Sequence, residues 1–299
     1  MPVNNSSKKV IVIAGPTASG KTAVAIDVAK YYNAQIISAD SRQCFKELNI
    51  GVARPSQQEL NQVTHHFIAT HSIHEKVTAA VFETYALEKT KDLFQYDDTV
   101  VVVGGTGLYI KAFCEGMDDI PDVPEIIRNE VIHLFKTHGI TYLQQKVMAL
   151  DPDFYKHGEI KNPQRLMRAL EVYKSTGRSI LSFRKGEKAN RPFHIHKFAM
   201  NVQKEQLHQN INHRVDLMIE RGLLEEVRSL LPYQHLNALQ TVGYKELFDY
   251  FRGSVDLSTA IQNIKVNTRK YAKRQITWFK KDTDYKWVSP SAEEIIPII

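Results

Sequence analysis

The first third of the chain alternates short, continuous apolar runs with longer segments in which apolar residues recur at helical spacing. The runs at residues 10–14, 35–38 and 99–103 are rich in valine, isoleucine or both, which is typical of parallel strands buried on both faces. Segments 21–32 and 78–94 have the helical spacing and lie between those runs. Strands that alternate with helices in this way predict βαβ connections and a parallel sheet.

The pattern changes near residue 121. Pro121 and Pro124 interrupt the chain, and residues 125–191 read as helices without a convincing strand. A strand-like segment returns at 194–202, and amphipathic helices follow it to residue 279. We therefore expect one domain made of residues 1–120 and 194–299, interrupted by a helical insertion at 121–193.

A glycine-rich motif stands between the first predicted strand and the first predicted helix. It reads G-x-x-x-x-G-K-[ST] and consists of Gly15, Pro16, Thr17, Ala18, Ser19, Gly20, Lys21 and Thr22. In this context backbone N–H groups converge on phosphate oxygens, Lys21 pairs with the terminal phosphates, and Thr22 holds Mg²⁺. The motif predicts a diphosphate-binding site with magnesium as cofactor, on an α/β fold whose parallel sheet is P-loop NTPase-like and flanked by helices.

Composition adds little to this picture. The 39 basic and 33 acidic residues leave a net charge of +6, which suits a polyanionic partner such as nucleic acid. Cys44 and Cys114 show no metal-ligand spacing and fit a reducing compartment. The apolar run at 10–14 is too short for a signal sequence or a membrane span. We expect a cytoplasmic protein without membrane association, and a monomer by default.

The motif alone does not name the reaction. Many P-loop enzymes split a nucleotide and hold Mg²⁺ through an aspartate at the end of an apolar strand. Here the strand at 99–103 ends in Gly104 and Gly105, and the acid that follows a strand is Asp40. A small-molecule or nucleotide kinase stays open as one alternative, and an ATP-switched RNA-binding protein as another.

Seven segments taken together point to one family. In chain order they are GPTASGKT, SADSRQ, GGTGLYIKA, LMRALEVY, GLLEEV, VGYKE and TRKYAKRQITWF. In series they resemble the tRNA dimethylallyltransferase family, also called tRNA isopentenyltransferase, from about residue 10 to residue 281. The resemblance implies transfer of the dimethylallyl group of dimethylallyl diphosphate to N6 of adenosine 37 of tRNA, next to the anticodon, with release of diphosphate.

The resemblance also implies catalytic roles. Asp40 orients N6 and accepts its proton, Thr106 contacts the diphosphate near its bridging oxygen, and Arg214 contacts the same diphosphate. The residues themselves leave alternatives open: Asp40 as a magnesium ligand or a helix cap, and Arg214 in a surface ion pair.

The implied partner is the anticodon stem-loop of tRNA, with the target adenosine flipped out of the stack. Its implied contacts are Asp40, Ser41, Arg42, Gln43, Thr106, Arg128, Gln164, Arg165, Leu166, Met167, Arg168, Gln240, Thr241, Val242, Gly243, Tyr244 and Lys245. A solvated helix face is the alternative for the basic residues among them. Segment 265–281, basic and interleaved with aromatics, suits either an RNA backbone or a core-facing helix.

Overall fold

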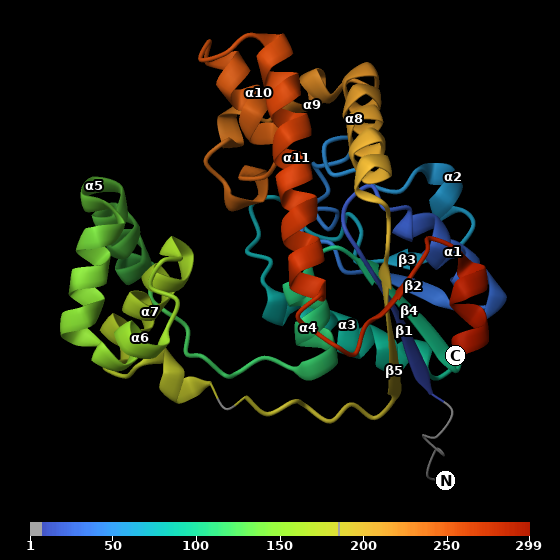
Figure 1. Cartoon of the computed structure of the whole chain (residues 1–299), viewed down its shortest axis with the longest axis horizontal. Helices are drawn as coiled ribbons and strands as arrows, with labels where there is room; N and C mark the ends of the chain where they lie inside the picture. Colours follow the sequence, from blue (N-terminus) through green and yellow to red (C-terminus); the bar gives the residue numbers. More distant parts are fainter. Residues whose placement is uncertain (1–7, 185) are drawn as a thin grey trace. The chain divides into compact units, whose positions relative to one another are not determined.

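The computed structural model describes residues 8–184 and 186–299, which form two compact units. An α/β unit takes the chain up to Gly116 and again from Asn190 onward, and a helical unit takes Met117–Ala189 (Figure 1). The predicted class, an α/β fold with a parallel sheet and a helical insertion, is confirmed.

The sheet of the α/β unit has six strands in the order β3-β2-β4-β1-β5-β6, and every neighbouring pair is parallel. The strands are β1 (Lys9–Ala14), β2 (Gln35–Ser38), β3 (His65–His66), β4 (Thr99–Gly104), β5 (His194–Met200) and β6 (Lys286–Val288). The four predicted strands are present. Strands β3 and β6 were not predicted, because two or three residues are too few to show a hydrophobic period.

Successive side chains of β1 pack into two different cores, one on each face of the sheet. Val10 and Val12 share a core with residues of α3 (Ala79–Leu93) and α4 (Gly107–Glu115). Ile11 and Ile13 pack on the other face with α1 (Lys21–Tyr31). Since helices cover both faces, every position of β1 after Lys9 is apolar, which explains the continuous run at residues 10–14.

The remaining helices of this unit are α2 (Gln57–Leu60), α8 (Lys204–Glu220), α9 (Leu223–Ser229), α10 (Tyr244–Phe251) and α11 (Leu257–Phe279), with short 3₁₀ turns at Leu231–Tyr233, Asn237–Leu239, Ala292–Glu294 and Ile296–Ile298. Helices α8 and α11 lie side by side (Figure 1). Leu207 and Ile211 of α8 pack with Ala272 of α11 around Ala18 of the glycine-rich motif. This small core attaches the two helices to the motif.

The helical unit comprises α5 (Glu125–Leu150), α6 (Pro152–His157), α7 (Pro163–Thr176) and a 3₁₀ turn at Ile180–Phe183. It has its own core, which includes Val131, Leu143 and Phe154. Helix α5 is broken at Gly139, whose φ of 75° and ψ of −173° are not helical. Among all described residues of the chain, no helix is both long enough and apolar enough to cross a membrane.

The two units divide four residues earlier, at each junction, than the predicted boundaries of 120/121 and 193/194. Helix α4 ends at Glu115, and Gly116 follows with a φ of 80°. On the return, Arg191 already belongs to the α/β unit. Its Nε donates to the carbonyl of Phe113 at 2.8 Å, and its Nη2 pairs with Glu83 at 2.7 Å. The prolines show only where the sequence pattern changes, whereas the hydrogen bonds of Arg191 show where the α/β unit resumes.

Candidate active site

The glycine-rich motif forms the loop between β1 and α1. Ala18 and Gly20 have positive φ values of 63° and 82°, and Gly20 caps α1 without a side-chain hydrogen bond. The first N–H groups of α1 therefore have no side-chain acceptor. Ser19 is 2% exposed, and its hydroxyl has no hydrogen-bond partner within the described residues. A buried, unpartnered hydroxyl beside a helix N-terminus fits a loop that binds phosphate.

Two cations stand beside this loop. The Nζ of Lys21 donates to the carbonyl of Pro16 at 3.3 Å, and Nη1 of Arg214 donates to Oγ1 of Thr17 at 3.3 Å. Within residues 8–184 and 186–299, neither cation forms an ion pair with a carboxylate. Burial and the charge of Arg214 lower the pKa of Lys21 to about 8, against a smaller opposing effect of Asp40. Burial likewise lowers the pKa of Arg214. Two adjacent desolvated cations favour a ligand with several negative charges.

Asp40 follows β2 and organises its own loop. Its Oδ1 accepts hydrogen bonds from the backbone N–H groups of Arg42 (2.9 Å) and Gln43 (3.3 Å). The neighbouring Ser41 N–H donates to Oγ1 of Thr106 at 3.0 Å, and the Thr106 N–H donates to the carbonyl of Ala39 at 3.2 Å. Asp40 and Thr106 come from different strands, β2 and β4, and these bonds hold them at one edge of the sheet.

A cleft of about 1460 Å³ opens in the α/β unit. Ligand pockets commonly measure about 300–1000 Å³, so this cleft has room for a diphosphate and a nucleobase together. The predicted site residues that line it are Thr17, Ala18, Ser19, Gly20, Lys21, Thr22, Asp40, Ser41, Arg42, Gln43, Arg214, Gln240, Thr241, Val242, Gly243 and Lys245. Thr106 does not line the cleft but reaches it through Ser41.

Gly15, Pro16 and Tyr244 belong to the α/β unit but do not line the cleft, and the remaining predicted residues, Arg128 and 164–168, belong to the helical unit. Leu166 and Met167 are buried in its core, so their side chains stabilise α7 rather than form a surface. Arg128 and Arg168 pair with the buried Glu171, at 3.9 and 3.5 Å. Arg165 is exposed and pairs with the equally exposed Glu159, which leaves it accessible to a phosphate.

Seven residues of α11 line the cleft and were not predicted as site residues: Asn263, Ile264, Asn267, Thr268, Tyr271, Arg274 and Gln275. Burial raises the pKa of Tyr271 to about 12, although its hydroxyl also forms a hydrogen bond with Thr106. Asn267, Tyr271 and Arg274 follow one another at intervals of four and three residues. This spacing of three or four residues is one face of a helix, a signal present in segment 265–281 that its basic and aromatic content obscured.

One wall of the cleft is the loop at residues 49–54. The carboxylate of Glu226 accepts the N–H groups of residues 49, 50 and 51 at 3.2, 2.7 and 3.0 Å, and also the hydroxyl of Tyr244 at 2.6 Å. A Cβ on Gly51 would lie 2.6 Å from the Tyr244 ring, so the close approach requires glycine. The side-chain amide of Gln43 donates to the carbonyls of residues 52 and 53. Gln43 and Tyr244 thus use their polar groups to hold the loop.

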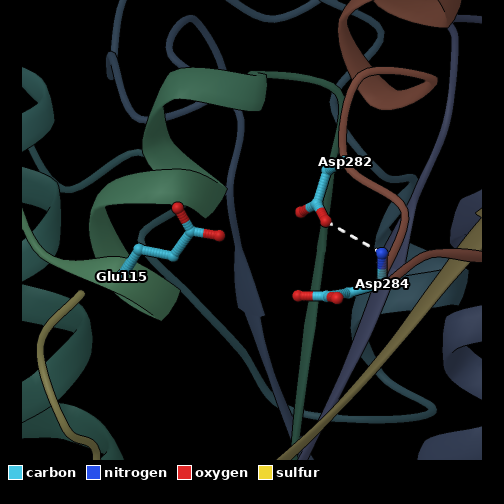
Figure 2. A group of neighbouring side chains, drawn as sticks. All are labelled: Glu115, Asp282 and Asp284. Atoms are coloured by element: carbon cyan, nitrogen blue, oxygen red, sulfur yellow. Dashed lines mark hydrogen bonds between the residues drawn. The ribbon is translucent and has the colours of Figure 1, made fainter. Parts of the chain in front are cut away.

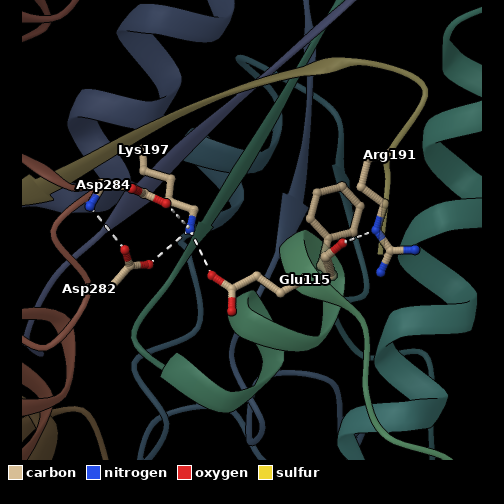
Figure 3. A network of polar contacts seen from close by, with 6 residues as sticks. Glu115, Arg191, Lys197, Asp282 and Asp284 are labelled. Carbon is tan, nitrogen blue, oxygen red and sulfur yellow. Dashed lines mark hydrogen bonds and ion pairs between the residues drawn. The ribbon is translucent and has the colours of Figure 1, made fainter. Parts of the chain in front are cut away.

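A separate acidic group stands outside the cleft. Oxygens of Glu115, Asp282 and Asp284 lie within 4.8 Å of one another (Figure 2). Figure 3 shows the ammonium of Lys197 among them, at 3.2, 2.8 and 3.5 Å. Burial opposes the charge of Lys197, but the hydrogen bond and charge of Asp282 outweigh it, so the pKa of Lys197 is raised. The lysine supplies the positive charge that a metal ion would supply, and the group links α4, β5 and the turn between α11 and β6.

The residues around the cleft are compatible with magnesium. Mg²⁺ usually takes one or two protein oxygens, substrate phosphates and several waters. Thr22 and Asp40 both line the cleft, and within the described residues no hydrogen bond engages Oδ2 of Asp40. One hydroxyl and one carboxylate oxygen match that ligand set.

Fold and cleft define a P-loop protein in which the glycine-rich loop, with Lys21 and Arg214 beside it, shares a cleft with the carboxylate of Asp40. Known proteins identify the family. A family model described as IPP transferase matches residues 43–282, and the chain belongs to this family. It is 51% identical over 282 residues to a tRNA dimethylallyltransferase of Christiangramia forsetii (94% of this chain, 93% of the relative) and 42% identical over 291 residues to tRNA dimethylallyltransferase 1 of Bacteroides fragilis (97% of each).

Solved structures of tRNA prenyltransferases are also similar to this chain. The full-length tRNA isopentenylpyrophosphate transferase of Bacillus halodurans aligns with a TM-score of 0.71 and 32% identity, over 97% of this chain and 94% of that one. A eukaryotic dimethylallyltransferase, described as acting on tRNA, aligns with a TM-score of 0.79 and 26% identity over 96% of this chain and 75% of that one. The fold of this chain is therefore that of the tRNA prenyltransferases.

Proposed function

We propose that this protein is a tRNA dimethylallyltransferase that moves the dimethylallyl group of dimethylallyl diphosphate to N6 of adenosine 37. The observation that supports this most directly is the pair of desolvated cations, Lys21 and Arg214, beside a phosphate-binding loop and close to Asp40. The cations suit the diphosphate, and the carboxylate suits the amine. Family membership over most of the chain supports the same reaction.

In this reaction the N6 nitrogen attacks C1 of the prenyl group, and the C1–O bond breaks. Diphosphate leaves with the electron pair, and its developing charge is stabilised by Lys21, Arg214 and the N–H groups of the loop. Asp40 accepts the N6 proton, because its Oδ1 is fixed by two backbone N–H groups while Oδ2 has no hydrogen bond in the described part of the chain. Charge and protons balance in one displacement.

Thr106 has a hydroxyl oriented by the protein. Its oxygen accepts the Ser41 N–H at 3.0 Å, and its hydroxyl also forms hydrogen bonds with the hydroxyls of Ser41, at 3.4 Å, and Tyr271. In the proposed reaction the hydroxyl turns its hydrogen to the bridging oxygen of the diphosphate, where charge develops as the bond breaks. Thr22 would hold Mg²⁺, which when bound neutralises charge on the diphosphate.

The tRNA partner follows from the family and from the mild positive charge of the chain. The target adenosine lies inside the anticodon loop, so it has to leave the stack to enter a cleft of this kind. Free tRNA is found in the cytoplasm, where we expect the enzyme to act. The kinase and RNA-switch alternatives are not favoured, because the relatives named above are prenyltransferases.

The proposed reaction is tested by incubating the protein with radiolabelled dimethylallyl diphosphate and an unmodified anticodon stem-loop RNA, with Mg²⁺ or with EDTA. Magnesium-dependent label on the adenosine next to the anticodon supports the proposal. A protein that leaves the RNA unlabelled but hydrolyses ATP or transfers its phosphate contradicts it. An RNA with guanosine at the target position serves as the matched control.

The activity should fall at alkaline pH. Lys21 is charged below its pKa of about 8 and loses its proton above it, so the free enzyme loses affinity for the diphosphate. We expect kcat/KM for dimethylallyl diphosphate, at saturating tRNA, to fall by about tenfold per pH unit well above that pKa. The kcat should fall less, since bound diphosphate keeps the lysine charged. Lys21→Arg is the control, because arginine stays charged over this pH range. If kcat/KM of the wild type is flat to pH 9.5, about 1.5 units above the pKa, Lys21 does not bind the diphosphate through its charge.

Arg165 should contribute to tRNA binding without contributing to the fold. Arg165→Ala removes an exposed cation whose partner, Glu159, is also exposed, so stability should be unchanged. We expect weaker tRNA binding and a log–log salt slope smaller by about 0.7–0.9, because one phosphate is no longer neutralised by the protein. Binding titrations at several salt concentrations measure the slope. An unchanged slope would assign Arg165 to a solvated face, and Lys161→Ala, a nearby exposed cation, is the comparison.

A further inference from the structure

Gln275 joins two parts of the site through one buried side-chain amide. The N–H of Thr17, in the glycine-rich motif, donates to its Oε1 at 2.9 Å. Its Nε2 donates to the carbonyl of Gly105, in the turn after β4, also at 2.9 Å. The side chain is 6% exposed, and it reaches from α11 to both loops. The phosphate-binding loop and the β4–α4 turn are therefore tied to each other by a third element.

The fit around this amide is tight. A Cβ on Gly105 would lie 2.2 Å from Nε2 of Gln275, so the turn can approach the amide only because residue 105 is glycine. A buried amide is costly unless its polar atoms are paired, and here both are. An apolar side chain of the same volume would fill the space without this cost. The use of glutamine points to the two hydrogen bonds, rather than to packing, as the reason for this residue.

Each of the two hydrogen bonds of Gln275 connects it to groups proposed to take part in the reaction. Thr17, held by its N–H, accepts a hydrogen bond from Arg214 through Oγ1 at 3.3 Å. Gly105, held by its carbonyl, precedes Thr106, whose Oγ1 accepts the N–H of Ser41 next to Asp40. Gln275 therefore lies between the groups proposed to hold the diphosphate and the groups proposed to serve the bridging oxygen and the adenine.

We infer that Gln275 is a positioning residue, which fixes the Thr106 hydroxyl relative to the diphosphate held by the loop and Arg214. This inference rests on the proposed transfer reaction. In this inference Gln275 does not contact the reacting atoms itself and acts only through Thr17 and Gly105. A displacement of a reacting group by about 1 Å can cost about a hundredfold in rate, so two hydrogen bonds at this point have a large effect on turnover.

The experiment compares wild type, Gln275→Met, Thr106→Val and the double variant in single-turnover transfer at saturating substrates. Methionine keeps the volume and length of the side chain but makes neither bond. We expect Gln275→Met to lower the transfer rate by about 10- to 100-fold, with the Kd for tRNA unchanged within about threefold. In the Thr106→Val background the same change should cost less than about threefold, because the position of the turn no longer matters once the hydroxyl is gone.

Two results overturn the inference: a Gln275→Met rate within about twofold of wild type, or a reduction that is equally large in the Thr106→Val background. The second result is what a purely structural role gives. If Gln275→Met does not fold, Gln275→Glu gives the same test, since it accepts from Thr17 but cannot donate to Gly105. Gln262→Met, at an exposed position of the same helix, is the control. A wild type that transfers no label would instead refute the proposed function.

Discussion

Arg214→Ala should lower the rate of prenyl transfer by about 10²–10³-fold, the scale for losing a donor that stabilises charge in the transition state. The guanidinium is largely desolvated, and it donates to Thr17 of the phosphate-binding loop. In the proposed reaction the guanidinium contacts the diphosphate as negative charge develops on it, so its removal should raise the barrier more than it weakens the binding of substrate. Single-turnover transfer at saturating substrates measures the effect.

Further variants distinguish the effect of the positive charge of Arg214 from that of its planar hydrogen-bonding geometry. Arg214→Lys keeps a positive charge but cannot reproduce the planar donor pair, so an intermediate rate is expected. Arg228→Ala removes an exposed arginine of α9 that does not line the cleft, and it should transfer at the wild-type rate. A rate for Arg214→Ala within about threefold of wild type would remove Arg214 from the reaction and return it to structural hydrogen bonding.

Asp40→Asn should lower transfer by about 10²-fold or more while tRNA binding persists, because the proton of N6 loses its acceptor. Asp40→Asn is more informative than Asp40→Ala, because it removes the base without removing the hydrogen bonds that hold the loop. Its Oδ1 can still accept the N–H groups of Arg42 and Gln43, so the loop keeps its conformation. Asp40→Ala removes both functions and should be at least as slow. Transfer rate and tRNA Kd are measured on the same preparations.

Asp27→Asn is the control for Asp40, since this aspartate lies on the exposed side of α1 and outside the cleft. It should leave rate and binding unchanged. If Asp40→Asn loses less than about threefold in rate, Asp40 is not the base. If it instead loses tRNA binding with an unchanged rate on bound RNA, its role is to hold the loop that receives the adenine.

The sequence by itself determined the features that are local. A run such as residues 10–14 is apolar throughout because a strand covered on both faces has no polar side, and β1 lies there. The glycine-rich motif requires only neighbouring residues to form its loop, so Lys21 and Thr22 were found without a structure. Asp40 also stood out, because it follows a strand, whereas Thr106 was predicted only through the family resemblance.

Only the tertiary structure decided which distant residues share the site. Arg214, which the family resemblance had assigned to the diphosphate, is 197 positions from Thr17, and Gln275, which was not predicted, is 258 positions from it; no periodicity encodes either pairing. Burial likewise separated residues that the sequence grouped together: Leu166 and Met167 are core, whereas Arg165 beside them is exposed. Strand pairs of two or three residues, such as β3, exist only through neighbours that supply their hydrogen bonds. Local pattern fixes what a segment can form, and packing then selects its neighbours, because burial and hydrogen bonding depend on residues far away in the chain.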